Sequence, residues 1–108
     1  MSSDLPGMDR REAHRPRFFA EVEIEMGDTR TQLRTQDISL EGMLLETEAP
    51  FKPGEEFKAR VRLKGEPPLE AECVVKRLVP GIGMGVEFLE MTTGDRVRLR
   101  KLVEALPH

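Results

Sequence analysis

Short runs in which apolar and polar residues alternate fill the sequence from about residue 20 to residue 89. This period of two is the feature that most limits the fold, because it gives a β-strand one buried and one exposed face. Turn-forming residues separate the runs, at Gly27-Asp28, Pro50 to Gly54, Gly65 to Pro68, and Pro80 to Gly83. Many short strands with such turns between them predict an all-β sandwich or a small closed barrel.

The individual strands can be placed from the alternation. The first two are expected at Ala20 to Met26 and at Thr29 to about Gln36, joined by the two-residue turn. The later strands are expected at Met43 to Thr47, Phe57 to Leu63, Leu69 to about Val79, and Met84 to Leu89. The second strand is polar on both faces apart from Leu33, so burial specifies its register only weakly.

The two ends of the chain depart from this pattern. Residues 1–17 are polar, contain Pro6, Gly7 and Pro16, and follow no structural period, which predicts a flexible arm. Residues near the other end recur at helical spacing, namely Leu99, Leu102, Val103 and Leu106, and Thr92 or Thr93 suits the N-cap. The expected organisation is an arm at 1–17, a β-barrel at 18–90 and an amphipathic α-helix of the same domain at 91–108.

Composition excludes several classes of function. The 17 Lys and Arg against 20 Asp and Glu give a net charge of -3, whereas general nucleic-acid binders usually carry a basic excess. The five Phe are joined by no Trp or Tyr, which limits base stacking. The single Cys73 with His14 and His108 provides neither a disulfide framework nor a zinc or catalytic constellation. We therefore expect no nucleic acid partner, no enzymatic activity, no metal and no cofactor.

Hydropathy gives no sign of membrane insertion. No apolar run approaches the roughly 18 residues that a spanning helix needs. The start Met1-Ser2-Ser3-Asp4 lacks the basic and then apolar layout of a signal peptide. We expect a cytoplasmic protein.

Two polar stretches carry the chemistry. Asp37-Ile38-Ser39-Leu40-Glu41-Gly42 presents a carboxylate, a hydroxyl and a position without a side chain between two apolar runs. Upstream, arginines gather at Arg10, Arg11, Arg15 and Arg17. Guanidinium groups are planar forks that suit phosphates and the two-acceptor edge of guanine. Together the two stretches predict a nucleotide ligand.

These stretches also carry a family resemblance. Arg11-x-x-x-Arg15 followed by Asp37-x-Ser39-x-x-Gly42 resembles the two-part signature of the PilZ domain, a bacterial receptor for the second messenger cyclic di-GMP. Gly85-Val86-Glu87-Phe88 resembles the last barrel strand of that family, and the likeness runs from about Arg10 to Leu106. The resemblance implies a six-stranded antiparallel β-barrel of PilZ type, with the flexible arm before it and the helix after it.

The resemblance also assigns roles to the motif residues. It implies that Arg11 and Arg15 grip the phosphates and guanine edges of cyclic di-GMP, and that Asp37, Ser39 and Gly42 line the other side. Asp37 can accept from guanine N1 and N2 hydrogens or hold an arginine, and Ser39 can donate to a phosphate. Gly42 leaves room for a flat base at the backbone. We expect Ser39 and Gly42 to affect binding more than folding, because a surface corner carries little of the core.

Arg10 bears on how many ligands bind. In the family, a basic residue before the first motif arginine accompanies an intercalated cyclic di-GMP dimer, so two ligands per chain are expected. The arm is expected to order over the ligand and to signal through an effector protein to motility or exopolysaccharide outputs. Arg17 is also close in sequence, although Pro16 stiffens the path to it. The alternative is a PilZ-like interaction module that acts through protein contacts without the ligand.

Overall fold

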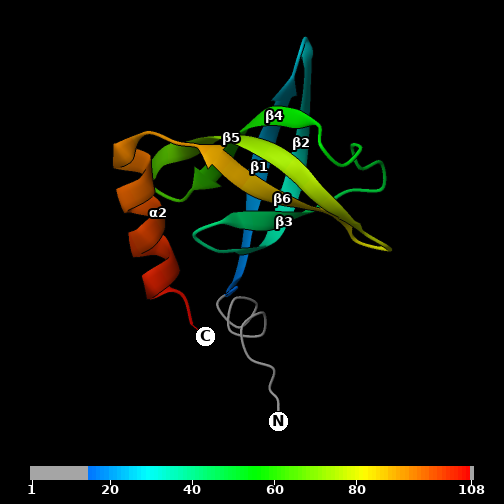
Figure 1. Ribbon diagram of the computed structural model, residues 1–108. Helices are drawn as coiled ribbons and strands as arrows, with labels where there is room; N and C mark the ends of the chain where they lie inside the picture. Colours follow the sequence, from blue (N-terminus) through cyan, green and yellow to red (C-terminus); the bar gives the residue numbers. More distant parts are fainter. Residues whose placement is uncertain (1–14, 108) are drawn as a thin grey trace.

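The alternating residues form six antiparallel strands in the computed structural model, which describes residues 15–107 (Figure 1). The strands are β1 (Arg17–Met26), β2 (Thr29–Ile38), β3 (Gly42–Glu46), β4 (Glu56–Leu63), β5 (Glu66–Val79) and β6 (Gly83–Glu90). They close into a barrel in the order β1-β2-β3-β6-β5-β4. The predicted six-stranded barrel is thereby confirmed.

The core consists of the inward-facing residues of all six strands. It is almost entirely aliphatic, and its fully buried members include Val22, Ile24, Ile38, Met43, Leu45, Val61, Leu69, Cys73, Val75 and Met84. Cys73 lies inside it as a small buried side chain, which is the usual place of a lone Cys. Each strand therefore turns one face to the core and leaves the other for polar side chains.

The first strand begins earlier than the alternation from Ala20 predicts. Phe18 and Ala20 continue the inward row, and β1 starts at Arg17, which was expected in the arm. One residue earlier, the Pro16 carbonyl accepts a hydrogen bond from the Ile38 backbone N–H at 3.2 Å, and Pro16 is buried. The arm boundary at residue 17 is thus corrected to before Pro16, because backbone pairing to β2 already holds the chain there.

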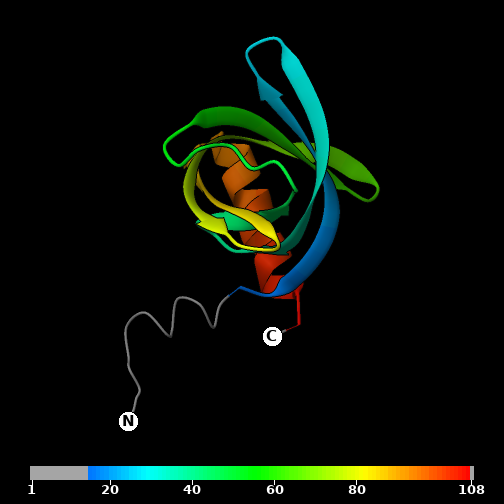
Figure 2. The same cartoon turned by 90° about the vertical axis from the view of Figure 1, so that its right-hand side faces the viewer.

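The C-terminal helix α2 (Thr93–Ala105) lies across one end of the barrel (Figure 2). Its N-cap is Thr92, whose hydroxyl accepts from the Asp95 backbone N–H at 3.1 Å, as expected for one of the two candidate threonines. Leu99 and Val103 are buried against the barrel core. In residues 15–107, no helix has the length and apolar character that crossing a bilayer requires.

A second set of contacts fastens the start of α2 to the β4–β5 hairpin. β5 begins with Glu66 and two prolines, where the sequence predicted only a turn. Arg98 donates to the carbonyls of Pro67 and Pro68 and pairs with Glu66 at 3.2 Å and with Asp95 at 2.9 Å. The helix is therefore a fixed part of the domain, held by polar contacts at its start and by apolar burial in its middle.

Candidate functional site

Asp37 stands on the outer surface of the barrel because of an irregularity in β2. It pairs with Arg17 of β1 on one side and with Leu44 of β3 on the other. The register shifts between Thr35 and Asp37, so that the extra residue between them has no partner on β3. Met43 and Leu45 are buried, which leaves Leu44 and the carboxylate opposite it on the outer face.

Thr35 closes this irregularity from the inside, and the sequence analysis missed it. Its side chain is fully buried, and its hydroxyl lies 2.8 Å from the Asp37 carbonyl and 2.9 Å from the Leu44 carbonyl. One hydroxyl proton serves two acceptors that belong to neighbouring strands. Thr35 therefore holds together the backbone on both sides of the Asp37 carboxylate.

The structure brings Arg15 and Asp37 together. Arg15 Nη1 donates to Asp37 Oδ1 at 3.3 Å, and the two side chains are 24% and 19% exposed. This contact uses one N–H of a guanidinium that carries five, so the group keeps donors for a further acceptor. The second arginine of the first motif is thus positioned by the carboxylate of the second motif.

Ser39 plays a different part from the one expected. Its side chain is only 8% exposed, and its hydroxyl accepts from the backbone N–H groups of Glu41 and Gly42 at 3.1 and 3.2 Å. The Ser39 N–H in turn donates to the Gly42 carbonyl at 2.8 Å. Ser39 is therefore buried and not part of an exposed surface corner as expected, and its hydroxyl satisfies the polar backbone of the turn.

Gly42 is also needed by the fold. A Cβ at this position would lie 2.0 Å from the Val86 carbonyl oxygen, which is far inside contact distance. Gly42 pairs with Glu87, and the Phe88 N–H donates to the Glu41 carbonyl at 2.8 Å. The absence of a side chain at Gly42 therefore allows β6 to approach β3 closely. This corrects the expectation that Gly42 can be changed without affecting folding.

Two of the predicted arginines, Arg10 and Arg11, lie outside the described residues. Arg17 is exposed at the start of β1, directly opposite Asp37, and its guanidinium carbon lies 5.9 Å from the centre of the Phe19 ring. Arg15 and Arg17 therefore flank one carboxylate.

A third arginine extends this surface, and sequence reasoning did not find it. In the strand register, Asp37 faces Leu44, Leu44 faces Gly85, and Gly85 faces Arg77 of β5. A Cβ on Gly85 would meet Arg77 Cγ at 3.5 Å and Cζ at 3.7 Å, so the Arg77 guanidinium lies over the glycine. Gly85 is two strand spacings from Asp37, about 10 Å. Leu44 and Gly85 thus lie between Asp37 and Arg77 across the sheet, and Gly85 is buried beneath the Arg77 side chain.

The opposite side of the barrel has a different charge pattern. Strand order places β4 and β5 across from β2 and β3, and there the basic strand β4 runs between two acidic strands. Arg60 lies 3.6 Å from Glu23 and, as an ion pair without a hydrogen bond, 3.2 Å from Glu70. Arg62 lies 3.6 Å from Glu21. The basic face of β4 is thus neutralised by its neighbours across the strands.

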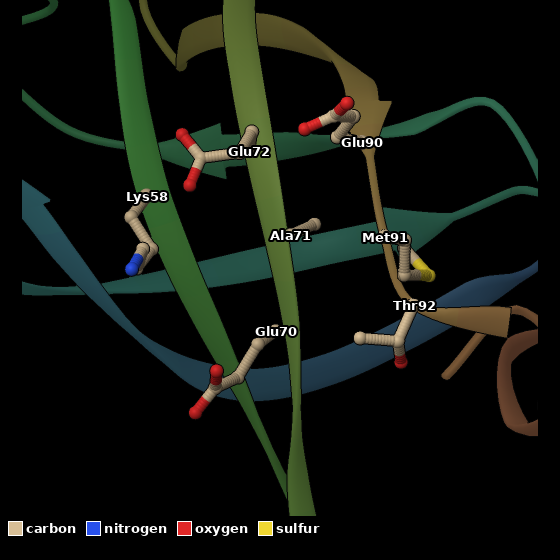
Figure 3. Close-up of a pocket in the computed structure, with 7 residues that line it drawn as sticks. All are labelled: Lys58, Glu70, Ala71, Glu72, Glu90, Met91 and Thr92. Atoms are coloured by element: carbon tan, nitrogen blue, oxygen red, sulfur yellow. The ribbon is translucent and has the colours of Figure 1, made fainter. Parts of the chain in front are cut away.

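A shallow pocket of about 330 Å³ lies on that same side (Figure 3). It is lined by Lys58, Glu70, Ala71, Glu72, Glu90, Met91 and Thr92. Three carboxylates face one ammonium group here, so the lining repels an anion. The pocket shares no residue with the two motifs and is not a candidate for a phosphate-bearing ligand.

Groups for covalent or metal chemistry are not gathered anywhere in the described part of the chain. Within residues 15–107, no three His, Cys, Asp or Glu side chains are placed to hold a metal ion. Burial, with a smaller contribution from the Glu72 charge, raises the pKa of the Cys73 thiol to about 12. Since the thiolate is the reactive form, this thiol is inert at neutral pH.

Comparison with known proteins identifies the family. The family model of the PilZ domain matches residues 9–105. The chain belongs to the PilZ domain family. The match spans the arm arginines, the Asp37 corner, all six strands and α2, so the resemblance seen in the two motifs extends over the whole domain. No curated protein matched the sequence.

Solved structures of PilZ proteins share the fold. An inhibitor of motility from Bacillus subtilis, MotI/DgrA, has a TM-score of 0.72 and 24% identity over 83% of this chain and 47% of its own. The PilZ domain of YcgR from Escherichia coli, solved with c-di-GMP, has a TM-score of 0.67 and 18% identity over 85% of this chain and 87% of its own. The PilZ domain of CeSA from a cellulose-synthesizing bacterium has a TM-score of 0.65 and 22% identity over 88% of this chain and 99% of its own. This chain therefore spans about half of the Bacillus protein and nearly all of the other two domains.

Proposed function

We propose that this chain is a receptor for cyclic di-GMP and not an enzyme, and that the ligand binds on the outer face of the barrel between the arm and the β2–β3 corner. The observation that carries the proposal is the Arg15–Asp37 pair at 3.3 Å, which joins the two parts of the PilZ signature in space. Membership of the family and the YcgR structure with c-di-GMP support it.

The chemistry of this face suits a dinucleotide with two phosphates and two guanines. Arg15 keeps free N–H donors for a phosphate or for guanine O6 and N7. Beyond Asp37 this face continues over the partly exposed Leu44 to Arg77, whose side chain lies over Gly85. Arg10 and Arg11 add two further cations in the sequence just before this point. Arg10, Arg11, Arg15 and Asp37 are the proposed ligand-binding residues, with Arg77 added from the register.

Ser39 and Gly42 take part in this proposal as the frame of the site. They hold the turn and the contact between β3 and β6, so that Asp37 keeps its position opposite Arg17. In this role neither the Ser39 hydroxyl nor residue 42 needs to contact the ligand. The second motif is then read as one ligand-facing residue and two residues that hold the backbone beneath it.

Titration calorimetry of the parent protein with cyclic di-GMP tests the proposal. We expect saturable binding, with cyclic di-AMP as the control ligand binding more weakly, because adenine lacks the two-acceptor O6 and N7 edge that guanidinium groups recognise. Absence of binding would leave the alternative of a PilZ-like interaction module that needs no ligand. The same titration gives the stoichiometry, for which Arg10 leads us to expect two ligands per chain.

The output of such a receptor passes to another protein, since the proposed chemistry ends at binding. We propose an effector in motility or exopolysaccharide production, supported by the names of the Bacillus and CeSA proteins that share the fold. A pull-down with the purified chain, with and without cyclic di-GMP, tests this: an effector should be retained in a ligand-dependent manner. Equal retention in both conditions would favour the interaction module.

A further inference from the structure

Phe19 breaks the pattern of its own strand. The outward positions of β1 are Arg17, Phe19, Glu21, Glu23 and Glu25, so one large aromatic side chain stands in an otherwise charged row. Phe19 is 55% exposed and does not belong to the core. Its neighbour Phe18, in contrast, packs against the core. A residue that violates the alternation without a packing reason is a candidate for a functional role.

The position of Phe19 relates it to the corner. Arg17 is the partner of Asp37 across the two strands, and Phe19 lies two residues further along β1 on the same face. Two residues of strand span about 7 Å, so Phe19 lies close to the Arg17–Asp37 pair. Phe19 lies at the register shift between the Arg17–Asp37 and Ala20–Thr35 pairs. The ring therefore stands at the edge of the proposed ligand face.

The surroundings of the ring suit a nucleobase. The Arg17 guanidinium carbon lies 5.9 Å from the ring centre, within the range of a cation–π contact, and both side chains are exposed. An aromatic ring beside a guanidinium group offers guanine a stacking face and donors for its O6 and N7 edge. Elsewhere on the outer surface of β1 the side chains are carboxylates, which repel the phosphates of the same ligand.

We propose that Arg17 and Phe19 form a stacking subsite for one guanine of the dinucleotide, next to the Arg15–Asp37 pair. This rests on the proposed function and adds two residues that neither signature motif contains. Phe19 supplies the π-face, and Arg17 supplies the guanidinium that holds the base edge or covers the ring. The subsite makes affinity depend on the aromatic character of residue 19 and not only on its apolar bulk.

A substitution series at residue 19 tests the stacking. Titration calorimetry with cyclic di-GMP should give Phe19→Trp at least the affinity of the parent, while Phe19→Leu and Phe19→Ala should both bind about tenfold more weakly. Thermal unfolding of the variants should stay near that of the parent, since the side chain is exposed. Arg17→Ala should lose a similar factor, and Arg17→Lys should not restore it fully, because an ammonium group lacks the planar fork.

Fluorescence gives a direct readout of contact, because the chain has no Trp or Tyr. Phe19→Trp should be quenched as cyclic di-GMP saturates the site, and Val97→Trp, at a residue of α2 that is 47% exposed, should not change. If the parent binds but Phe19→Ala binds equally well and Phe19→Trp keeps its fluorescence, the subsite is refuted and the receptor stands. A loss in Phe19→Ala with none in Phe19→Leu indicates apolar contact and also refutes stacking. No binding by the parent refutes both proposals.

Discussion

The two halves of the Asp37 corner differ in what they face. Asp37 and Arg15 point outward and contact each other with their side chains partly exposed. Ser39 and Gly42, only two and five residues further on, are buried and make their contacts with backbone. The outward residues of this short motif are thus accessible to a ligand, and its buried residues hold the backbone. Substitutions in the outward half should change binding, and those in the inward half should change stability.

The largest effect is expected at Gly42. Gly42→Ala places a Cβ 2.0 Å from the Val86 carbonyl oxygen, and because both partners are backbone, β3 and β6 must separate. We expect a loss of about 3 kcal/mol or more in the free energy of unfolding, measured by urea denaturation. Gly83→Ala, which meets the Leu45 carbonyl at the same 2.0 Å at the other end of β3, is the matched control. If Gly42→Ala were as stable as the parent while Gly83→Ala was destabilised, Gly42 would be needed for the ligand and not for the fold.

Arg15 should show the opposite behaviour. Arg15→Ala removes charge-assisted hydrogen bonds to the ligand worth about 1.5 to 3 kcal/mol, so the affinity for cyclic di-GMP should fall by roughly ten- to a hundredfold. The free energy of unfolding should change little, because the Arg15–Asp37 pair is partly exposed. Arg60→Ala is the control: it removes an arginine that carboxylates already neutralise on the opposite side. Equal losses of affinity in both variants would point to a general charge effect and not to a site.

Ser39 tests the inward half at moderate strength. Ser39→Ala removes the acceptor of the part-buried Glu41 N–H and the buried Gly42 N–H, and the loss of these bonds should cost about 1 to 2 kcal/mol. Thermal or urea unfolding should register this loss, while saturating ligand still binds to the folded fraction. Leu40→Ala, at an exposed position of the same turn, should leave stability unchanged. A stable Ser39→Ala variant with lost affinity would mean that the hydroxyl contacts the ligand.

The smallest effect is expected at Thr35, whose substitution should change both stability and binding. Thr35→Val keeps the shape but removes the hydroxyl that reaches the Asp37 and Leu44 carbonyls, at a cost of about 1 kcal/mol in stability. We also expect a several-fold loss of affinity, because the backbone that carries Asp37 is released. Thr35→Ser restores the hydroxyl and should recover the affinity even if it leaves a small cavity. If Thr35→Ser did not recover the affinity, and the affinity of both variants simply followed their stability, Thr35 would contribute to the fold only.

The sequence by itself determined the strands, their number and the helix. Period-two alternation specifies which residues are buried, and turn residues specify where strands stop, so six strands and an N-cap at Thr92 or Thr93 were predicted from local patterns. The structure places the cap at Thr92. The pairing of an arginine motif with an acidic turn motif also singled out the family, which the family model confirmed. These features depend on neighbours in the chain, and a sequence displays them directly.

Tertiary structure alone decided which motif residues face outward and what lies next to them. The role of Gly42 depends on β6, which arrives more than forty residues later in the chain and approaches too closely for a side chain. The place of Arg77 depends on a register shift between β5 and β6, and that of Phe19 on one between β1 and β2. A single bulge changes which face a side chain joins, and no local pattern in either strand records it, because the shift is a property of the pair.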